Sequence, residues 1–183
     1  MFEELKLFGP TERSIVVQTR KGNSIDNLVE IEPGEMERRK YRLLSQLFGQ
    51  NWIERKPATG VYNCAGHVWA SRRTSILPGQ AWRTILHEDG YRRLSEMEVP
   101  VAGDLVLYTD EKEEYLHVGM ILEMHEGISP QSPKIPWVLS KWNSTSGEVM
   151  HFSHDVPYPK QGITATIEYW TDRPLDKPTM SEN

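Results

Sequence analysis

The 183-residue chain carries 26 acidic and 21 basic side chains, a formal net charge of −5, with 38% hydrophobic and 26% charged residues. This composition is typical of a globular protein, and the length predicts one domain with a sizeable core. No stretch approaches the ~18 apolar residues that a membrane span needs. The negative charge argues against nucleic acid as a main partner. We therefore expect neither a nucleic-acid partner nor a membrane partner.

Cys64 is the single cysteine of the sequence. One cysteine excludes an intrachain disulfide framework and leaves a free thiol, which suits a reducing compartment. The opening residues, Met1–Lys6, carry acids where a signal peptide has bases, and no apolar segment follows them. We therefore predict a cytoplasmic protein, whose export would require a non-classical route.

The first regular elements are predicted to be a strand at residues 14–19, where β-branched side chains are frequent, and a helix at residues 35–48. Gly49 stands where a C-terminal cap glycine is expected. Apolar side chains recur along one face of this helix. We interpret that face as core contact, and its residues are Met36, Leu43, Leu44, Leu47 and Phe48.

Shorter helical segments come next, and strands fill the remainder of the chain. The predicted helices lie at residues 65–73, 80–86 and 91–97, and the predicted strands at residues 104–108, 115–124, 137–142 and 163–170. An acidic turn at residues 110–114 joins the first two of these strands. Helices followed by strands, without βαβ alternation, predict an α+β fold in which N-terminal helices pack on a C-terminal antiparallel sheet.

The domain organisation is expected to be simple. No internal repeat or low-complexity segment divides the chain. We predict a single domain over residues 1–174, including an N-terminal extension of about residues 1–50. Residues 175–183, which follow Pro174 and contain Pro178, are predicted to form a flexible tail.

Cys64 lies at the first turn of a predicted helix, after a turn marked by Pro57 and Gly60. Unpaired backbone N–H groups and the helix dipole favour negative charge there, which lowers a thiol pKa from its free value of about 8.5. The alternative is that Cys64 is a small buried hydrophobic residue. A nucleophilic cysteine also needs a nearby base and a group that orients the base.

Among the six histidines, His117 is the best candidate base, because it opens a strand whose following residues are apolar. A polar ring at the edge of a buried strand needs a partner, although backbone carbonyls could satisfy it. His67 is close to Cys64 in sequence, but its ring would have to curl back over the helix start. The histidines lack metal-ligand spacing and one cysteine cannot build a structural zinc site, so no metal or cofactor is predicted.

Two motifs resemble those of a known family. Asn63–Trp69 (NCAGHVW) resembles the nucleophile motif Asp-Cys-Ser-Gly-Leu-Val of the NlpC-type cysteine peptidases. Pro100–Tyr108 followed by His117–Leu122 resembles the same family's Pro-Gly-Asp-Leu-Val-Phe-Phe and His-Val-Gly-Ile-Tyr, a layout that CHAP amidases share. The resemblance covers residues 60–142. It implies a papain-like core, with a cysteine-bearing helix on a sheet whose second strand begins with histidine.

Carried over by position, the resemblance implies that Cys64 is the nucleophile and His117 the general base. The family's third polar residue corresponds to Ser140, which would complete the catalytic set. Asn143 and His151 are alternatives for this third position. Serine would orient an imidazole only weakly through its hydroxyl group.

The resemblance implies a cysteine hydrolase, a thiol protease or amidase that cleaves amide bonds in a peptide or peptidoglycan-like substrate. The backbone N–H of Cys64 and the hydroxyl of Tyr62 would stabilise the oxyanion. Asn63 and Ala65 replace the family's usual Asp and Ser. These departures leave two alternatives open: a binding or immunity-type module that kept the fold and lost catalysis, and an acyltransferase using the same residues.

Overall fold

The fold, seen in a computed structural model that describes residues 15–127, 129 and 131–175, is built on an antiparallel sheet of seven strands. The order of the strands is β1-β6-β5-β4-β3-β7-β2. The strands are β1 (Ile53–Lys56), β2 (Arg92–Arg93), β3 (Leu105–Thr109), β4 (Tyr115–His125), β5 (Ile135–Lys141), β6 (Glu148–Phe152) and β7 (Thr166–Thr171). The helices are α1 (Glu35–Phe48), α2 (Cys64–Trp69) and α3 (Gln80–Glu88), with 3-10 turns η1 (Gly49–Asn51) and η2 (Tyr158–Gln161). The α+β class predicted from the sequence is therefore confirmed.

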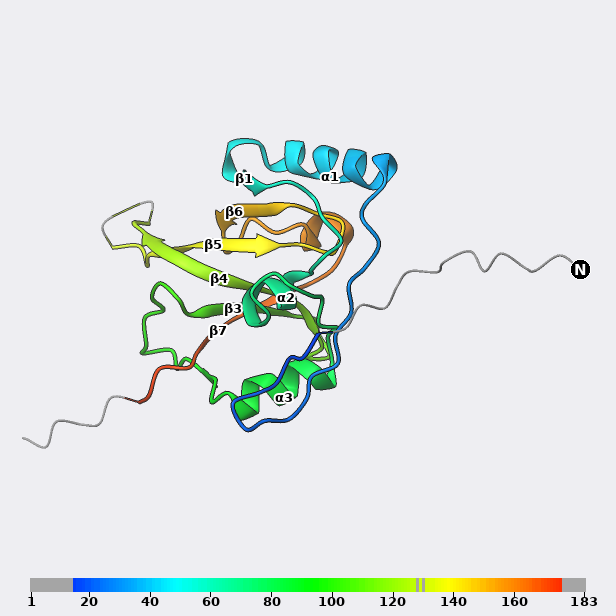
Figure 1. The fold of residues 1–183 in the computed structure, drawn as a ribbon. Coiled ribbons are helices and arrows are strands. Elements are labelled where there is room, and N and C mark those ends of the chain that lie inside the picture. Colours follow the sequence, from blue (N-terminus) through cyan, green and yellow to red (C-terminus); the bar gives the residue numbers. More distant parts are fainter. Residues whose placement is uncertain (1–14, 128, 130, 176–183) are drawn as a thin grey trace, which may run out of the picture.

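The sheet separates two apolar clusters, because successive side chains of a strand point to opposite faces. On one face, α2 and α3 pack with Leu107 and Val118. On the other, Tyr108 and Val138 pack with side chains of α1 and η2. Figure 1 shows α2 crossing the middle of the sheet, while α1 lies along the β1 edge. The site is thus supported by core on both sides of β4.

The amphipathic face of α1 does not lie where the sequence indicated. Met36, Leu43 and Leu47 are exposed, whereas Tyr41 is the buried residue of the helix. Leu44 and Phe48, the last residue of the helix, pack against the apolar cluster that contains Tyr41. Because α1 rests on the edge of the sheet through one narrow side, part of the apolar stripe remains outside the core.

Two further predictions about secondary structure are wrong. The described part of residues 14–19 forms only an isolated bridge from Gln18 to Ser24. The segment 91–97 is no helix: Gly90, with φ of +78°, turns the chain after α3, and β2 pairs with β7. Strands β1 and β6 were not predicted, since short strands carrying charged residues have weak apolar alternation.

The C-terminal strands and the acidic hairpin follow the sequence prediction closely. β3 and β4 pair from Leu105↔Met120 to Thr109↔Tyr115, and the Asp110 carboxylate accepts hydrogen bonds from two backbone amides of the turn. The predicted tail lies outside the described residues from residue 176 onward. Within the described ranges, no helix is both long and apolar enough to cross a membrane.

Candidate active site

Asn63 caps α2 and fixes the position of Cys64. Its side-chain oxygen accepts from the backbone N–H of Gly66 at 2.9 Å and of Ile76 at 3.1 Å, and its Nδ2 donates to the Ile76 carbonyl at 2.8 Å. An asparagine side chain can both accept and donate, whereas the carboxylate usual in the resembled motif can only accept. The Asn63 departure therefore has a structural explanation: it joins the start of α2 to the segment leading into α3.

α2 ends at Trp69, earlier than predicted, because the chain reverses immediately after it. Ser71 and Arg72 adopt left-handed φ values of 50° and 66°, and the Arg72 amide donates to the Gly66 carbonyl at 3.0 Å. A Cβ atom on Gly66 would lie 1.7 Å from the Thr74 carbonyl oxygen, so the returning chain needs glycine there. The reversal turns the Arg72 side chain back toward the helix.

The Cys64 thiol is buried against the start of β4. Burial raises its pKa to about 11, and hydrogen bonds from the backbone amides of Val118, Ala65 and Cys64 itself oppose that shift. The positive charge of Lys141 also favours the thiolate. The burial effect is larger than these others together, so the thiol is neutral at pH 7.

The thiol reaches β4 where β4 and β5 separate. Their pairing ends at Gly119↔Ser140, whereas β3 stays paired with β4 through Tyr108↔His117. The Ile121 amide of β4 donates toward the β3 side, to Asp104. By two-residue alternation the Val118 amide therefore points toward the β5 side, where no strand partner follows. Cys64 takes that place on the α2 face of the sheet, in the cluster that also contains Val118.

His117 precedes Val118 on β4, so its ring lies on the opposite face of the sheet from Cys64, beside Tyr108, and it is completely buried. Its ring stacks on Trp142 with a centroid distance of 4.1 Å and an interplanar angle of 18°. Within the described residues, neither ring nitrogen has a hydrogen-bond partner, so no Cys64–His117 bond is formed. Burial first, and then repulsion by His151 and His67, hold the pKa of His117 well below its usual value. The ring is neutral.

Ser140 contacts His151 instead of His117. His151 Nδ1 is 2.7 Å from the Phe152 carbonyl, which can only accept, so Nδ1 carries the proton. His151 Nε2 then accepts from the Ser140 hydroxyl at 2.9 Å. Burial lowers the pKa of His151 to about 4. Ser140 and His151 are two of the three candidates for the third catalytic position. The structure pairs them with each other and not with His117.

Asn143, the remaining candidate, caps the turn after β5. Its side-chain oxygen accepts from the Thr145 amide at 2.9 Å and from the Ser146 hydroxyl at 2.8 Å. The ring of His117 is oriented by Trp142, an aromatic side chain directly after β5. The sequence analysis did not assign that role to Trp142, because stacking leaves no recognisable motif.

A buried carboxylate beside α2 was missed by sequence reasoning. Glu148 is fully buried and accepts from the Tyr62 hydroxyl at 2.6 Å and from Arg72 Nε at 2.5 Å. Burial alone would raise the pKa of Glu148, but these hydrogen bonds from Arg72 and Tyr62 lower it. The Tyr62 hydroxyl, expected to serve as an oxyanion donor, is thus engaged with Glu148.

Lys141 is a buried cation in the same region. Its ammonium donates to the carbonyl oxygens of Thr59, Asn143, Ser144 and Ser146 at 2.7–3.1 Å. Burial lowers the pKa of Lys141 to about 8. The ammonium joins the loop before Cys64 to the turn after β5. Lys141 ends β5, next to the apolar run of the predicted strand, and a charged residue beside such a run is the sequence signal that could have identified it. Glu148 opens β6, a strand that the sequence did not predict, and had no such signal.

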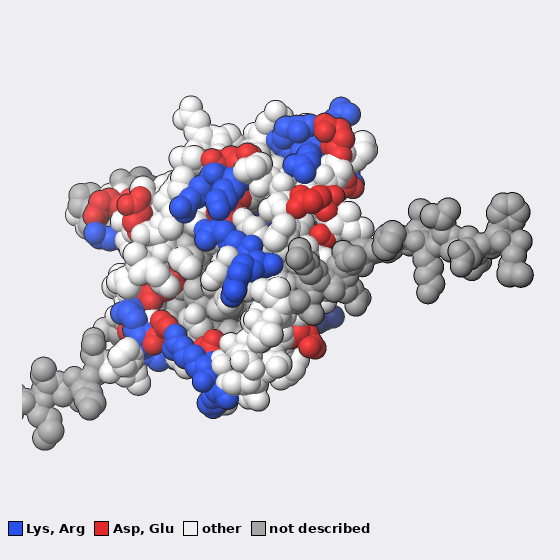
Figure 2. All heavy atoms as spheres, viewed as in Figure 1, with Lys and Arg blue, Asp and Glu red and all other residues white. Residues whose placement is uncertain are grey.

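The surface around α2 is basic. Figure 2 shows Lys and Arg side chains across the middle of this face, over β1 and beside α2, although the net charge of the chain is −5. The basic residues of these segments are Arg55, Lys56, Arg72 and Arg73. A local positive field of this kind attracts anionic groups more than the net charge suggests.

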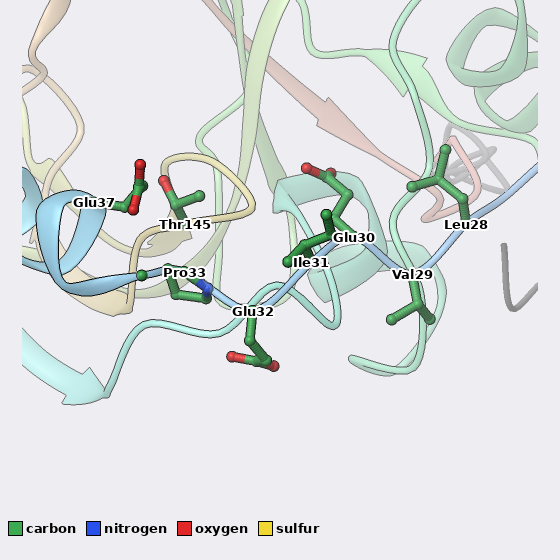
Figure 3. A pocket seen from close by; sticks show the side chains of 9 residues that line it. Leu28, Val29, Glu30, Ile31, Glu32, Pro33, Glu37 and Thr145 are labelled. Atoms are coloured by element: carbon green, nitrogen blue, oxygen red, sulfur yellow. The ribbon is translucent and has the colours of Figure 1, made fainter. Parts of the chain in front are cut away.

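A groove of about 700 Å³ runs along residues 28–34 and is closed by Glu37 and Thr145. In Figure 3, Leu28 and Glu30 point to one side of this segment, and Val29 and Glu32 point to the other. None of the predicted catalytic residues lines this groove. The groove is therefore separate from the Cys64 thiol.

Together these observations define an α+β fold in which Cys64 and His117 are both buried near the start of β4. No family model, curated protein or solved structure matches the chain. Within residues 15–127, 129 and 131–175, no group of three or more His, Cys, Asp or Glu side chains is arranged to hold a metal ion.

Proposed function

We propose that this protein is a cysteine hydrolase of amide bonds on a papain-like core, with Cys64 as the nucleophile and His117 as the general base. The observation that carries the proposal is the meeting of the thiol with the start of β4. The neighbouring residue of that strand, His117, is fully buried, and neither of its ring nitrogens has a hydrogen-bond partner among the described residues. Perturbed, unpaired titratable groups of this kind concentrate at functional sites.

The shifted pKa values define the resting state of the proposed mechanism. A pKa of about 11 for Cys64 and a strongly lowered pKa for His117 give a neutral thiol and a neutral imidazole, not an ion pair. The thiol proton therefore moves to His117 while the sulfur attacks the carbonyl carbon. Hydrogen bonds between catalytic groups are often long or poorly aligned in a free enzyme and tighten in the substrate complex.

The reaction then follows the two steps of covalent catalysis. The C–S bond forms, and the tetrahedral intermediate collapses as the C–N bond breaks and His117 returns its proton to the leaving amine. Water, deprotonated by His117, attacks the thioester, and the C–S bond breaks to release the acid and the thiol. An acceptor other than water in the second step would make the same site an acyltransferase. The basic face around α2 favours a peptide or peptidoglycan-like substrate with an anionic group.

The proposal is tested by incubating the protein with muropeptides and with cell-lysate peptides and reading the products by mass spectrometry. We expect Cys64→Ser and His117→Ala to abolish cleavage, and His87→Ala, a change of an exposed histidine, to leave it intact. Thermal unfolding of each variant shows whether the fold is kept, and His117→Gln provides a less disruptive second change. Full activity of either site variant would refute the assignment.

A non-catalytic binding module is the second candidate. It is favoured by the elevated pKa of Cys64 and by the lack of a hydrogen bond to His117 among the described residues. For such a module, wild-type protein and Cys64→Ser give identical peptide spectra. A difference between these spectra that depends on Cys64 excludes this candidate.

A further inference from the structure

His67 lies on α2 one turn after Cys64, with its side chain almost wholly buried. Its Nε2 is 3.0 Å from Nη2 of Arg72. A guanidinium group only donates hydrogen bonds, so Nε2 must accept and Nδ1 must carry the ring proton. Nδ1 is buried and has no hydrogen-bond partner in the part of the chain that the structure describes. Among the described residues, the structure therefore leaves a buried N–H donor without an acceptor.

The tautomer of His67 is held by a chain of charged contacts. Arg72 is fixed by the Glu148 carboxylate, which also accepts from Tyr62. Burial, followed by repulsion from Arg72, Arg55 and Lys141, lowers the pKa of His67 to about 4 despite the opposing attraction of Glu148. His67 is therefore a neutral ring with its acceptor nitrogen occupied. It can donate through Nδ1 but cannot serve as a base.

The position of His67 on α2 places its side chain near the proposed nucleophile, Cys64. Residues three apart on a helix lie on the same face, with Cβ atoms about 5–6 Å apart. The Cys64 sulfur is not its acceptor, because Nδ1 makes no hydrogen bond at all within the described residues. An unsatisfied buried donor destabilises the folded state by about 1–3 kcal/mol. A ligand oxygen beside Cys64 would remove that penalty.

We propose that the Nδ1–H of His67 donates to the carbonyl oxygen of the acyl group that Cys64 attacks, and so stabilises the oxyanion. The inference rests on the proposed hydrolase function. When the C–S bond forms, the carbonyl electron pair moves onto the oxygen, and a fixed neutral donor stabilises that charge without itself transferring a proton. His67 takes the role expected of Tyr62, whose hydroxyl is bonded to Glu148.

Two substitutions separate the donor from the Arg72 contact. In His67→Gln, the amide oxygen can occupy the position of Nε2 and accept from Arg72, but no N–H remains at the position of Nδ1. In His67→Asn, the amide N–H can occupy the position of Nδ1, but the Arg72 contact is lost. A purely structural role predicts that the glutamine variant is the milder change. An oxyanion role predicts the reverse.

The assay compares two reactions of Cys64 in the full-length protein. Acylation by 4-nitrophenyl acetate passes through an oxyanion and releases 4-nitrophenolate, whereas alkylation by iodoacetamide displaces iodide and forms no oxyanion. We expect His67→Gln to slow acylation about 100-fold, the loss typical of one oxyanion donor, and to leave alkylation within about twofold. His67→Asn should retain more acylation than His67→Gln.

The outcomes separate this inference from the function on which it rests. Equal acylation of wild type and His67→Gln overturns the role of His67 and leaves the hydrolase proposal standing. An equal fall in both reactions also overturns it, because His67 would then act on the thiol or on the fold. If wild-type Cys64 is alkylated but never acylated, the hydrolase proposal fails and the inference fails with it. Cys64→Ser verifies that the measured acylation occurs at Cys64.

Discussion

The reactivity of the Cys64 thiol should rise steadily with pH well beyond neutrality. With a pKa of about 11, a fraction of about 10⁻⁴ is thiolate at pH 7. A free thiol of pKa about 8.5 has a thiolate fraction of roughly 10⁻¹·⁵ at the same pH, about 300-fold more. Because the thiolate is the nucleophile, we expect the rate of alkylation by iodoacetamide to increase about tenfold per pH unit up to pH 9.5, without a plateau.

The measurement follows carboxamidomethylation of the Cys64 peptide by mass spectrometry from pH 5 to pH 9.5. The same protein unfolded in urea is the matched control, and its rate should level off near pH 8.5–9. Restricted access to the buried thiol lowers the rate at every pH alike and leaves the slope unchanged, so the slope reports the pKa. A plateau of the folded protein below pH 8 would refute the neutral thiol and would indicate a preformed ion pair with His117.

Three further predictions concern stability. Glu148→Gln removes one partner of a buried ion pair and should lower the free energy of unfolding in urea by about 3 kcal/mol, whereas the exposed change Glu54→Gln should alter it by less than about 0.5 kcal/mol. Gly66→Ala places a methyl group 1.7 Å from a backbone oxygen and should destabilise by about 3 kcal/mol or shift α2, as judged by the same unfolding curves. Burial alone would raise the pKa of Asp104, but hydrogen bonds from Arg173 hold this pKa below its usual value. The stability that the Asp104 carboxylate contributes is therefore present above about pH 4 and is lost as pH falls through the lowered pKa. Thermal unfolding in acid should therefore depend less steeply on pH in Asp104→Asn, and equal slopes would contradict that assignment.

The strands that carry the fold could be predicted from the sequence because their signals are local. Apolar runs bounded by turns identified β3, β4, β5 and β7, and an acidic cluster identified the hairpin between β3 and β4. The exposed side of α1 could not be predicted. Helical periodicity identifies an apolar face but does not show how much of it a neighbouring sheet edge will cover.

Only those residues of the candidate site that stand in short sequence motifs could be predicted from the sequence. Cys64 and His117 stand in recognisable local patterns, and the structure brings the thiol to the strand that carries His117. The partners of Arg72 depend on a left-handed turn after α2, and no propensity of that segment predicts it. Lys141 and Glu148 face one another only through the register of β5 and β6. Such pairings across the fold follow from tertiary structure and leave no signature in a single sequence.

The polar groups buried around Cys64 lower the stability of the fold. The ring nitrogens of His67 and His117 that lack a hydrogen-bond partner within the described part of the chain each destabilise the fold by about 1–3 kcal/mol, and a left-handed Arg72 adds roughly 1–2 kcal/mol. Apolar residues of similar volume would avoid these losses. These two histidines belong to α2 and to the start of β4, the two elements that meet at Cys64, and both are held in defined orientations, one by Trp142 and one by Arg72. Fixed, unsatisfied polar groups are what a catalytic site requires before its substrate arrives, because the substrate then supplies the missing partners without reorganisation of the protein.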